Sequence, residues 1–385
     1  MTKKYIPYGR QEITQADLDA VAASLQSDYL TQGPRIQEFE EALAAKLGAK
    51  YAVVFNSATS ALHGGCFALG LGEGDEVITT PNTFVATSNA ALYVGAIPVF
   101  ADIEADTGNI DVANIEALIS PKTKLIVPVH YAGHPVDLEA IRKIADRHNL
   151  YVMEDACHAP GAMYKNTQIG DCAFSDMVSF SFHPVKHIAA GEGGAILTNR
   201  EDLYEKLLVF RTHGITKKNM RRNDLGDWYF EMHVLGYNYR LTDMQAALGL
   251  SQLQRLDESV EKRRKIADFY FEAFADNPYF DLPPERDYAK NSYHLFPIRL
   301  KNPYNAQKTA IFGALRENGI GVQTHYIPAY THPYYQDLGY PMGLCPVCED
   351  FYEREISIPM YPSLSDQDLA FVVTQIFATL QCFES

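Results

Sequence analysis

The sequence predicts an α/β protein: a large domain with a mainly parallel, seven-stranded sheet flanked by helices, followed by a smaller C-terminal α+β domain. Its 385 residues suffice for two or three compact units, at roughly 100–200 residues per domain. In the first two-thirds of the chain, short apolar runs alternate with amphipathic stretches, as expected for helices packed on both faces of a buried sheet. The seven apolar runs lie at residues 51–55, 76–80, 97–103, 124–132, 151–157, 177–182 and 194–199.

Two amphipathic stretches predict particular helices. After Asp137, which favours a helix start, Leu138, Ile141 and Ile144 fall on one stripe that stops before Asn149. From about 242 to 275 the chain predicts a single long helix.

The last part of the chain has a different composition and predicts a separate unit. It carries apolar segments at 292–300 and 321–330, a helix around 305–318 and a closing helix from Ser365. We therefore expect a large domain over residues 1–245, a connecting helix over 246–275 and a small domain over 276–385. The first 30 residues are expected to pack on the small domain.

Charge and hydropathy limit the classes of function. The chain has 48 acidic and 33 basic residues, a net charge of −15, which repels phosphate backbones and anionic lipids. No apolar run approaches the roughly 18 residues that span a bilayer, and the N-terminus has no apolar signal region. We expect a cytoplasmic protein that binds neither nucleic acid nor membranes.

The six cysteines do not suggest a disulfide framework in so long a chain. Cys345 and Cys348 form a CPVC pair, but no second CxxC or HxxxH supplies further ligands. We expect no metal site and interpret this segment as a loop with two thiols.

The most informative segment surrounds Lys186. A buried strand leads through Ser181, His183 and Pro184 to Lys186, and a glycine-rich return follows at 191–194. A lone lysine is usually a solvated surface charge. In a crowded, partly dry pocket, however, desolvation lowers its pKa and makes it able to form a Schiff base, for which pyridoxal phosphate (PLP) is the usual aldehyde.

PLP would require three further features. Asp155, at the end of the 151–157 run, could hold the pyridine nitrogen protonated, although it could also be a helix N-cap. Residues 55–60 end a strand and open a helix, which offers N–H groups to a phosphate or is merely a capping pattern. Phe84 could stack on the ring, although an isolated phenylalanine more often lies in a core.

These features occur in one order along one alternating fold. Over essentially its whole length the sequence resembles the DegT/DnrJ/StrS family of fold-type I, PLP-dependent sugar aminotransferases. The blocks that carry the resemblance are YLTQGP (29–34), FNSATSALH (55–63), TPNTFVAT (80–87), EDACHAPGA (154–162), SFHPVKHIAAGEGG (181–194), GYNYRLTDMQAALG (236–249) and THYIP (324–328). Blocks 30–34, 55–63 and 349–359 most resemble the members that aminate C4 of a UDP-linked 4-keto-6-deoxy-N-acetyl hexose in pseudaminic acid biosynthesis.

The resemblance implies roles for residues of this sequence. Lys186 would form the Schiff base and shuttle the proton, Asp155 would pair with the pyridine nitrogen, and His158 would lie near the ring and its phenolic oxygen. These three would be the catalytic residues. Ser57, Ala58, Thr59 and Ser181 would bind the phosphate, Phe84 would stack on the ring, and Thr31, Gln32, His183, His325 and Tyr326 would contact the substrate.

The family also implies partners. Asn238 would reach the phosphate of the neighbouring subunit's cofactor, so a homodimer with shared active sites is expected. L-Glutamate would donate the amino group, leaving pyridoxamine phosphate (PMP), which would then aminate the sugar of a nucleotide-linked substrate. The stretch 217–232 is less like the most similar members. Its basic cluster could meet a diphosphate, but we favour a solvated loop.

Alternative functions remain open. Other family members aminate C3 or C4 of dTDP- or GDP-linked sugars, and one variant of the fold carries histidine in place of the lysine and dehydrates its sugar. Here Lys186 holds that position, with His187 beside it, which favours amino transfer. A nicotinamide-dependent epimerase would need a glycine fingerprint after the first strand, where this chain reads NSATSALHGG. A non-enzymatic regulator on this fold would be expected to lack Lys186 or Asp155.

Overall fold

The computed structural model describes residues 4–222 and 224–384 and confirms the predicted fold class. Its main sheet has the strand order β1-β9-β8-β5-β4-β2-β3, in which β9 is antiparallel to both neighbours and the other pairs are parallel. Each of the seven predicted runs contains one strand. The strands are β1 (Tyr51–Phe55), β2 (Glu76–Thr79), β3 (Ile97–Phe100), β4 (Thr123–Val127), β5 (Tyr151–Asp155), β8 (Met177–Ser181) and β9 (Gly194–Thr198).

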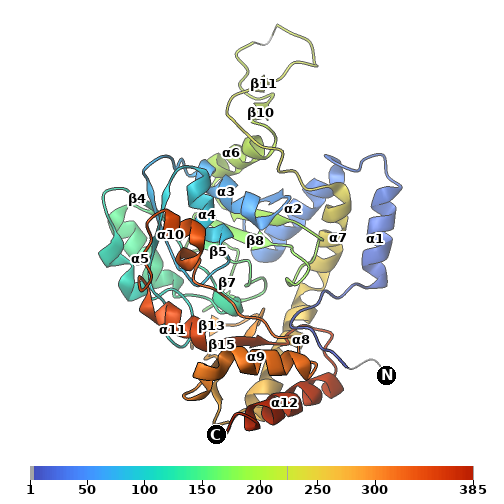
Figure 1. Cartoon of the computed structure of the whole chain (residues 1–385). Helices are drawn as coiled ribbons and strands as arrows, with labels where there is room; N and C mark the ends of the chain where they lie inside the picture. Colours follow the sequence, from blue (N-terminus) through green and yellow to red (C-terminus); the bar gives the residue numbers. More distant parts are fainter. Residues whose placement is uncertain (1–3, 223, 385) are drawn as a thin grey trace.

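Helices cover both faces of this sheet (Figure 1). Successive strand residues such as Val53 and Val54 point to opposite faces and belong to two different hydrophobic clusters. On one face pack α3 (Ala58–Ala68), α4 (Ala86–Tyr93) and α6 (Glu201–Arg211). On the other face pack α2 (Pro34–Leu47), α5 (Leu138–His148) and α7 (Asp243–Gln254). As predicted, α5 begins after Asp137, whose side chain accepts a hydrogen bond from Ala140 N, and ends at Asn149.

The C-terminal part has its own sheet and its own core. Strands β12 (Phe280–Asp281), β14 (Phe296–Leu300) and β15 (Glu355–Ile358) form an antiparallel sheet. It packs with α8 (Leu256–Ala273), α9 (Lys308–Glu317) and α12 (Asp366–Gln381) around one apolar cluster. Two short helices, α10 (Pro333–Asp337) and α11 (Pro346–Arg354), lie between α9 and α12 in sequence. A small separate sheet consists of β6 (Met163–Tyr164), β7 (Thr167–Gln168) and β13 (Ala289–Lys290). The domain limits given above stay a prediction.

The expected single helix over 242–275 is wrong. Arg255 leaves the helical conformation (φ −104°, ψ 10°) and separates α7 from α8. Its guanidinium instead turns to Asp17, 2.7 Å away. Asp257 and Glu258 lie in the first turn of α8, where negative charge stabilises a new helix N-terminus.

The N-terminal segment does not pack as one unit. Of its described part, Ile6 pairs with Ile320 and Tyr8 O accepts from Met360 N, so this stretch lies on the C-terminal sheet region. Helix α1 (Gln15–Leu25) packs beside α7 instead, held by Asp17 (Figure 1). Residues 1–3 lie outside the described residues.

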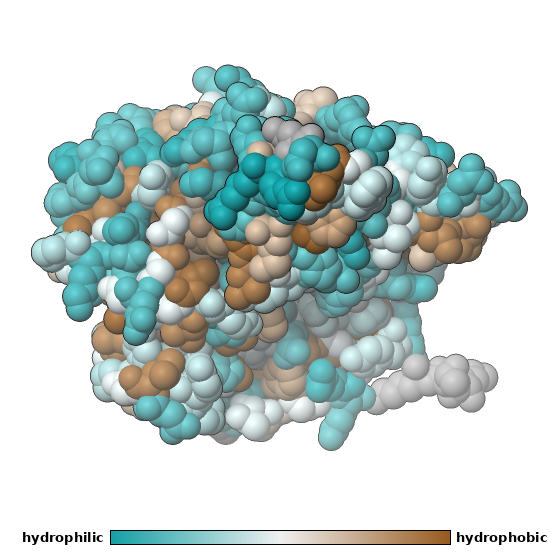
Figure 2. All heavy atoms as spheres, turned by 90° about the horizontal axis from the view of Figure 1, so that it is seen from above, coloured by the Kyte–Doolittle hydropathy of each residue, from teal (hydrophilic) through white to brown (hydrophobic). Residues whose placement is uncertain are grey.

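Residues 215–222 and 224–232 belong to an arm that projects from the large sheet's side of the molecule (Figure 1). Its base is the two-stranded ladder of β10 (Ile215–Thr216) and β11 (Glu231–Met232). The segment predicted as a loop, 217–232, therefore starts directly after one of these strands and ends in the other. Trp228, Met232 and the neighbouring Leu235 are 79%, 60% and 72% exposed. In the view from above, apolar areas reach the surface between hydrophilic ones on this face (Figure 2).

The CPVC segment is not a loop, as the sequence had suggested. Cys345 is the residue before α11 and Cys348 lies in its first turn, and both thiols are buried and free. Asp102 accepts from the N–H groups of Val347 and Cys348 at this helix start. Within the described residues, none of the helices is both long and apolar enough to cross a membrane.

Candidate active site

A cavity of about 560 Å³ opens between the main sheet and the C-terminal part of the chain. Asp155 at the end of β5 and Ser181 at the end of β8 lie at its base, where α/β sheets commonly bind ligands. Eleven of the fourteen predicted site residues line this one cavity: Ser57, Ala58, Thr59, Phe84, Asp155, His158, Ser181, His183, Lys186, His325 and Tyr326.

Lys186 lies on a loop that two backbone hydrogen bonds close, from Phe182 N to Gly193 O and from Ala190 N to Phe182 O. Its side chain is half-buried, and Nζ lies 3.3 Å from Nε2 of His294. Burial lowers the pKa of Lys186 to about 8, against the opposing effects of Cys157 and Asp155. About a tenth of this amine is therefore uncharged at pH 7, far more than for an ordinary lysine, and the uncharged amine is the form that attacks a carbonyl carbon.

Asp155 is 5% exposed and presents its carboxylate to the cavity. Oδ2 accepts from Thr87 Oγ1 at 2.7 Å, and Oδ1 accepts from Cys157 N at 3.1 Å. Turns follow β5, so no helix starts here, and the interpretation of Asp155 as a helix N-cap is wrong. A buried carboxylate with two donors and no cation can still receive a hydrogen bond from a protonated ring nitrogen.

The N-terminus of α3 forms another wall. Ser57 caps the helix by accepting from Ser60 N at 3.1 Å, and the first N–H groups, at Ala58 and Thr59, have no partner within a helix of this geometry. Gly194 lets strand β9 approach them, because a Cβ at this position would lie 2.5 Å from Ala58 N. With the hydroxyls of Thr59 and Ser181 nearby, this wall can bind a phosphate.

The third wall comes from residues 323–326 of the C-terminal part. Tyr326 Oη lies 3.0 Å from His158 Nε2, and His325 Nδ1 lies 2.9 Å from Ser357 Oγ. Burial lowers the pKa of His325 to about 3, so this imidazole is neutral. Phe84, 61% exposed, lies nearer the opening with its ring centroid 6.4 Å from that of Tyr326.

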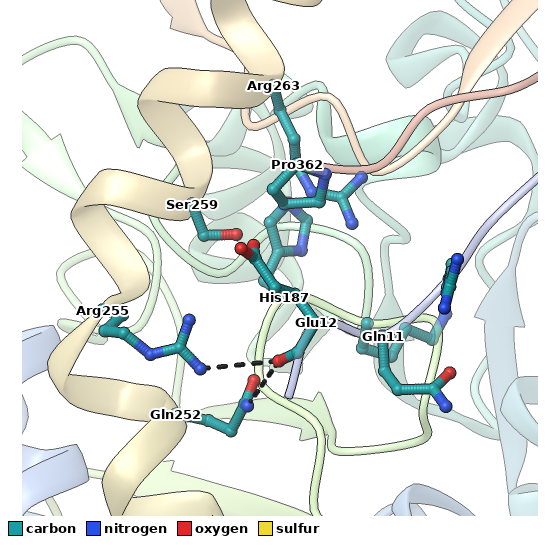
Figure 3. A pocket seen from close by; sticks show the side chains of 10 residues that line it. Gln11, Glu12, His187, Gln252, Arg255, Ser259, Arg263 and Pro362 are labelled. Atoms are coloured by element: carbon teal, nitrogen blue, oxygen red, sulfur yellow. Dashed lines mark hydrogen bonds between the residues drawn. The ribbon is translucent and has the colours of Figure 1, made fainter. Parts of the chain in front are cut away.

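A second, much smaller cavity of about 20 Å³ lies on the other side of the lysine loop. His187, Arg255 and Arg263 line it, and Glu12 O accepts hydrogen bonds from Gln252 and Arg255 at its edge (Figure 3). It is too small for a cofactor. His187 thus lines the small cavity and not the large one. Of the adjacent residues Lys186 and His187, only Lys186 lines the large cavity.

Three predicted residues lie elsewhere. Thr31 pairs with Thr242, and the side chain of Gln32 accepts from Arg240. Asn238 pairs with Thr212 at the foot of the arm and is exposed. None of them lines the large cavity of this single chain.

The sequence analysis missed several cavity residues. His294 and Tyr8 come from segments far from Lys186 in the chain, and only the fold brings them together. Thr87 did carry a signal, because it lies one helical turn after Phe84 in the same TPNTFVAT block, where a hydroxyl at the start of α4 faces the same way.

These residues fit PLP. The cavity supplies an amine of lowered pKa for the aldehyde, a buried carboxylate for the pyridine nitrogen and a helix N-terminus with hydroxyls for the phosphate. The three groups lie on different walls of one cavity, as the three ends of the cofactor require. By contrast, no group of three or more metal-ligating side chains occurs among residues 4–222 and 224–384.

Comparison with known proteins points in the same direction. Residues 11–377 match the model of the DegT/DnrJ/EryC1/StrS aminotransferase family. The chain is 42% identical to the UDP-4-amino-4,6-dideoxy-N-acetyl-beta-L-altrosamine transaminase of Campylobacter jejuni over 379 residues, 98% of each chain. It is 40% identical to the spore coat polysaccharide biosynthesis protein SpsC of Bacillus subtilis, over 97% of this chain and 96% of that protein. The structure of PseC from Helicobacter pylori, an aminotransferase of pseudaminic acid biosynthesis, is 39% identical and superposes with a TM-score of 0.93 over 99% of this chain and 100% of that one.

Proposed function

The chain belongs to the DegT/DnrJ/EryC1/StrS family of PLP-dependent sugar aminotransferases, and we propose that it transfers an amino group from L-glutamate to C4 of a nucleotide-linked 4-keto-6-deoxy sugar. The proposed substrate is of the UDP-4-keto-6-deoxy-N-acetyl-L-altrosamine type. The observation that carries the proposal is the meeting of Lys186 and Asp155 in one cavity of a chain so similar to an altrosamine transaminase. The cofactor of the family is PLP, which solved relatives hold in PLP and PMP forms.

We propose that Lys186 binds the cofactor and then moves the proton. When bound, PLP supplies an electron sink for the pair left by the substrate's C–H bond. Lys186 Nζ would take the α-proton of glutamate and later return a proton to the sugar carbon. An amine whose pKa lies near 8 is suited to both directions of transfer.

Asp155 is proposed to hold the ring nitrogen protonated, and His158 to pack near the ring. Ala58 and Thr59, with Ser57 and the hydroxyl of Ser181, would bind the phosphate at the start of α3. His183, His325 and Tyr326 would face the sugar. Phe84 would cover the ring from the side of the opening.

We further propose a homodimer in which each site takes residues from both chains. Asn238 is exposed and lies beside the foot of the arm, where a side-chain amide could donate to a phosphate of the partner's cofactor. The apolar side chains of Trp228, Met232 and Leu235 would be covered in such a dimer. Thr31 and Gln32, which lie outside the cavity of one chain, would contact substrate in the assembled site. A cytoplasmic location remains a prediction.

A second candidate function is the amination of a different nucleotide-linked keto sugar, and the experiment below tests it as well. The identity to SpsC, 40%, is nearly as great as the 42% identity to the altrosamine transaminase, and SpsC is named for spore coat polysaccharide biosynthesis rather than for one amino sugar. The position of the keto group and the nucleotide could therefore differ from those proposed.

Purified protein should be incubated with ¹⁵N-labelled glutamate, PLP and a panel of UDP-, dTDP- and GDP-linked 3-keto and 4-keto sugars. We expect ¹⁵N at C4 of the UDP-linked 4-keto-6-deoxy-N-acetyl sugar, identified by mass and NMR. Faster labelling of another sugar would replace the proposed substrate, and a dehydrated product without ¹⁵N would refute amino transfer.

A further inference from the structure

Two hydrogen bonds in series connect the backbone of Ala132, through the ring of His158, to the hydroxyl of Tyr326 in the cavity wall. Ala132 N lies 3.3 Å from His158 Nδ1, and His158 Nε2 lies 3.0 Å from the hydroxyl of Tyr326. The two rings are 24° from parallel, with centroids 5.9 Å apart. Tyr326 is also fixed through its backbone N–H, which donates to Asn82 Oδ1 at 3.2 Å.

The direction of these hydrogen bonds follows from the first donor, the backbone N–H of Ala132. A backbone N–H can only donate, so His158 Nδ1 must be the unprotonated nitrogen. Burial first, and then the charge of Lys186, lower the pKa of His158 well below 6.5, so the ring is neutral and its single proton is on Nε2. That proton is donated to the oxygen of Tyr326, which leaves the phenol's own proton for a different acceptor. In the described part of the chain, His158 is the sole hydrogen-bond partner of this hydroxyl.

The phenol stays protonated. Burial first, and then the charge of Asp155, raise the pKa of Tyr326 well above 10. Tyr326 therefore presents a permanent O–H donor to the cavity rather than a phenolate.

Tyr326 and the amine of Lys186 line the same cavity, and contacts between two histidines link them. His158 packs on His294 with ring centroids 4.3 Å apart, and His294 Nε2 is 3.3 Å from Lys186 Nζ. An acceptor placed beside that amine could be the carbonyl oxygen of a keto substrate or the phenolic oxygen of the cofactor. Tyr326 is half-buried, and its ring centroid lies 6.4 Å from that of the exposed Phe84.

We propose that Tyr326 is a catalytic residue whose O–H donates a hydrogen bond to the carbonyl oxygen of the keto substrate, and that His158 is its positioning residue. This inference rests on the proposed amino transfer. As the amine nitrogen attacks, a C–N bond forms, the C=O π bond breaks and its electron pair moves to the oxygen, where the Tyr326 O–H stabilises the charge. The oxygen leaves as water with the two protons that the amine loses, and Tyr326 keeps its own proton. The reverse sequence releases the keto acid from glutamate.

Tyr326→Phe in the holoenzyme tests the role, because loss of the glutamate α-proton to Lys186 involves no carbonyl oxygen whereas formation of the keto acid does. Exchange of the glutamate α-hydrogen in D₂O, followed by NMR, should stay within about twofold of wild type. Single-turnover formation of 2-oxoglutarate and amination of the keto sugar should both fall by roughly 10²-fold, the effect of removing one donor to a developing oxyanion. The pH titration of the bound cofactor's absorption should not move.

His158→Gln should also keep α-hydrogen exchange while it slows keto-acid formation and sugar amination. The loss should be smaller than in Tyr326→Phe, because the glutamine amide can accept from Ala132 N and donate to Tyr326. Tyr335→Phe is the matched control, because its buried hydroxyl bonds to Ser88 and Asn89 outside the cavity. Melting temperatures show whether each variant folds.

Equal loss of exchange and conversion in Tyr326→Phe would refute the inference, as would unchanged conversion. A shifted absorption titration would assign the proton to the cofactor's phenolic oxygen instead. If wild type neither exchanges nor converts glutamate, the proposed function itself fails, and the inference with it.

Discussion

At the scale of single residues, the site depends on one buried amine and one buried carboxylate that do not form an ion pair with each other. Burial lowers the pKa of Lys186 to about 8, so the amine can act as nucleophile and base. The two hydrogen-bond donors of Asp155, Thr87 Oγ1 and Cys157 N, are neutral, so this carboxyl group has no ion-pair partner among the described residues.

Asp155→Ala separates this role from a purely structural one. The variant should still bind PLP through Lys186, but the glutamate half-reaction should slow by roughly 10²–10³-fold because a preorganised charge is lost. Stopped-flow absorbance measures this rate, and thermal unfolding measures the cost of leaving the Cys157 N–H without its acceptor, about 1–3 kcal/mol. Thr87 Oγ1 keeps Thr83 Oγ1 and Phe84 O within hydrogen-bonding distance. Unchanged rates together with a lower melting temperature would show that Asp155 only supports the fold.

Residues near a strand end or a glycine-rich turn could be predicted from the sequence, as Lys186, Asp155 and Ser181 were. His294 could not, because it lies more than a hundred positions from Lys186 and the 3.3 Å contact between them exists only in the folded chain. Tyr8 likewise comes from an N-terminal segment with no local sign of a site.

At the scale of elements, the contact between β9 and the start of α3 shapes the proposed phosphate site. Gly194 pairs with Phe55 and Ser181, so a side chain here would press on Ala58 without room to turn away.

Gly194→Ala should therefore weaken PLP binding at least tenfold while Lys186 stays intact, because its Cβ displaces the N–H groups at the start of α3. Absorbance titration of cofactor-free protein measures the affinity. Gly313→Ala in α9 is the control, since a Cβ there meets nothing within 4 Å and alanine favours a helix by about 1 kcal/mol. Equal PLP affinity for the two variants would contradict the proposed phosphate site.

The strands were easier to predict than the helix ends. Each buried strand has a continuous apolar run. The break at Arg255 has only a weak local signal, the acidic pair Asp257 and Glu258, because the ion pair of Arg255 is with Asp17, over two hundred positions away. The interpretation of CPVC as a loop failed for a similar reason. Its helix start is stabilised by Asp102 from a distant segment.

At the scale of the whole molecule, the proposed active site takes residues from two chains. Trp228 on the projecting arm and Asn238 at its foot are both exposed in one chain, as a partner-facing surface would be.

Hybrid dimers test this requirement. Lys186→Ala and Asn238→Leu should each be nearly inactive alone. Unfolded and refolded together, they should form hybrids in which one site carries both lesions and the other carries neither, so up to half of the sites in each hybrid regain activity. Absence of recovery, with hybrids demonstrated by differently tagged chains, would place Asn238 in its own subunit's site.

The most direct test of the central claim, that Lys186 binds the cofactor in this cavity, is borohydride reduction of the PLP-loaded protein followed by peptide mass spectrometry. We expect a single reduced adduct, on the peptide that contains Lys186, and none in Lys186→Ala. When cofactor-free protein is instead mixed with PLP and reduced after a short time, the yield should rise with pH through about 8, because burial lowers the pKa of this lysine and only the uncharged amine reacts with the aldehyde. An adduct on any other lysine would contradict the account.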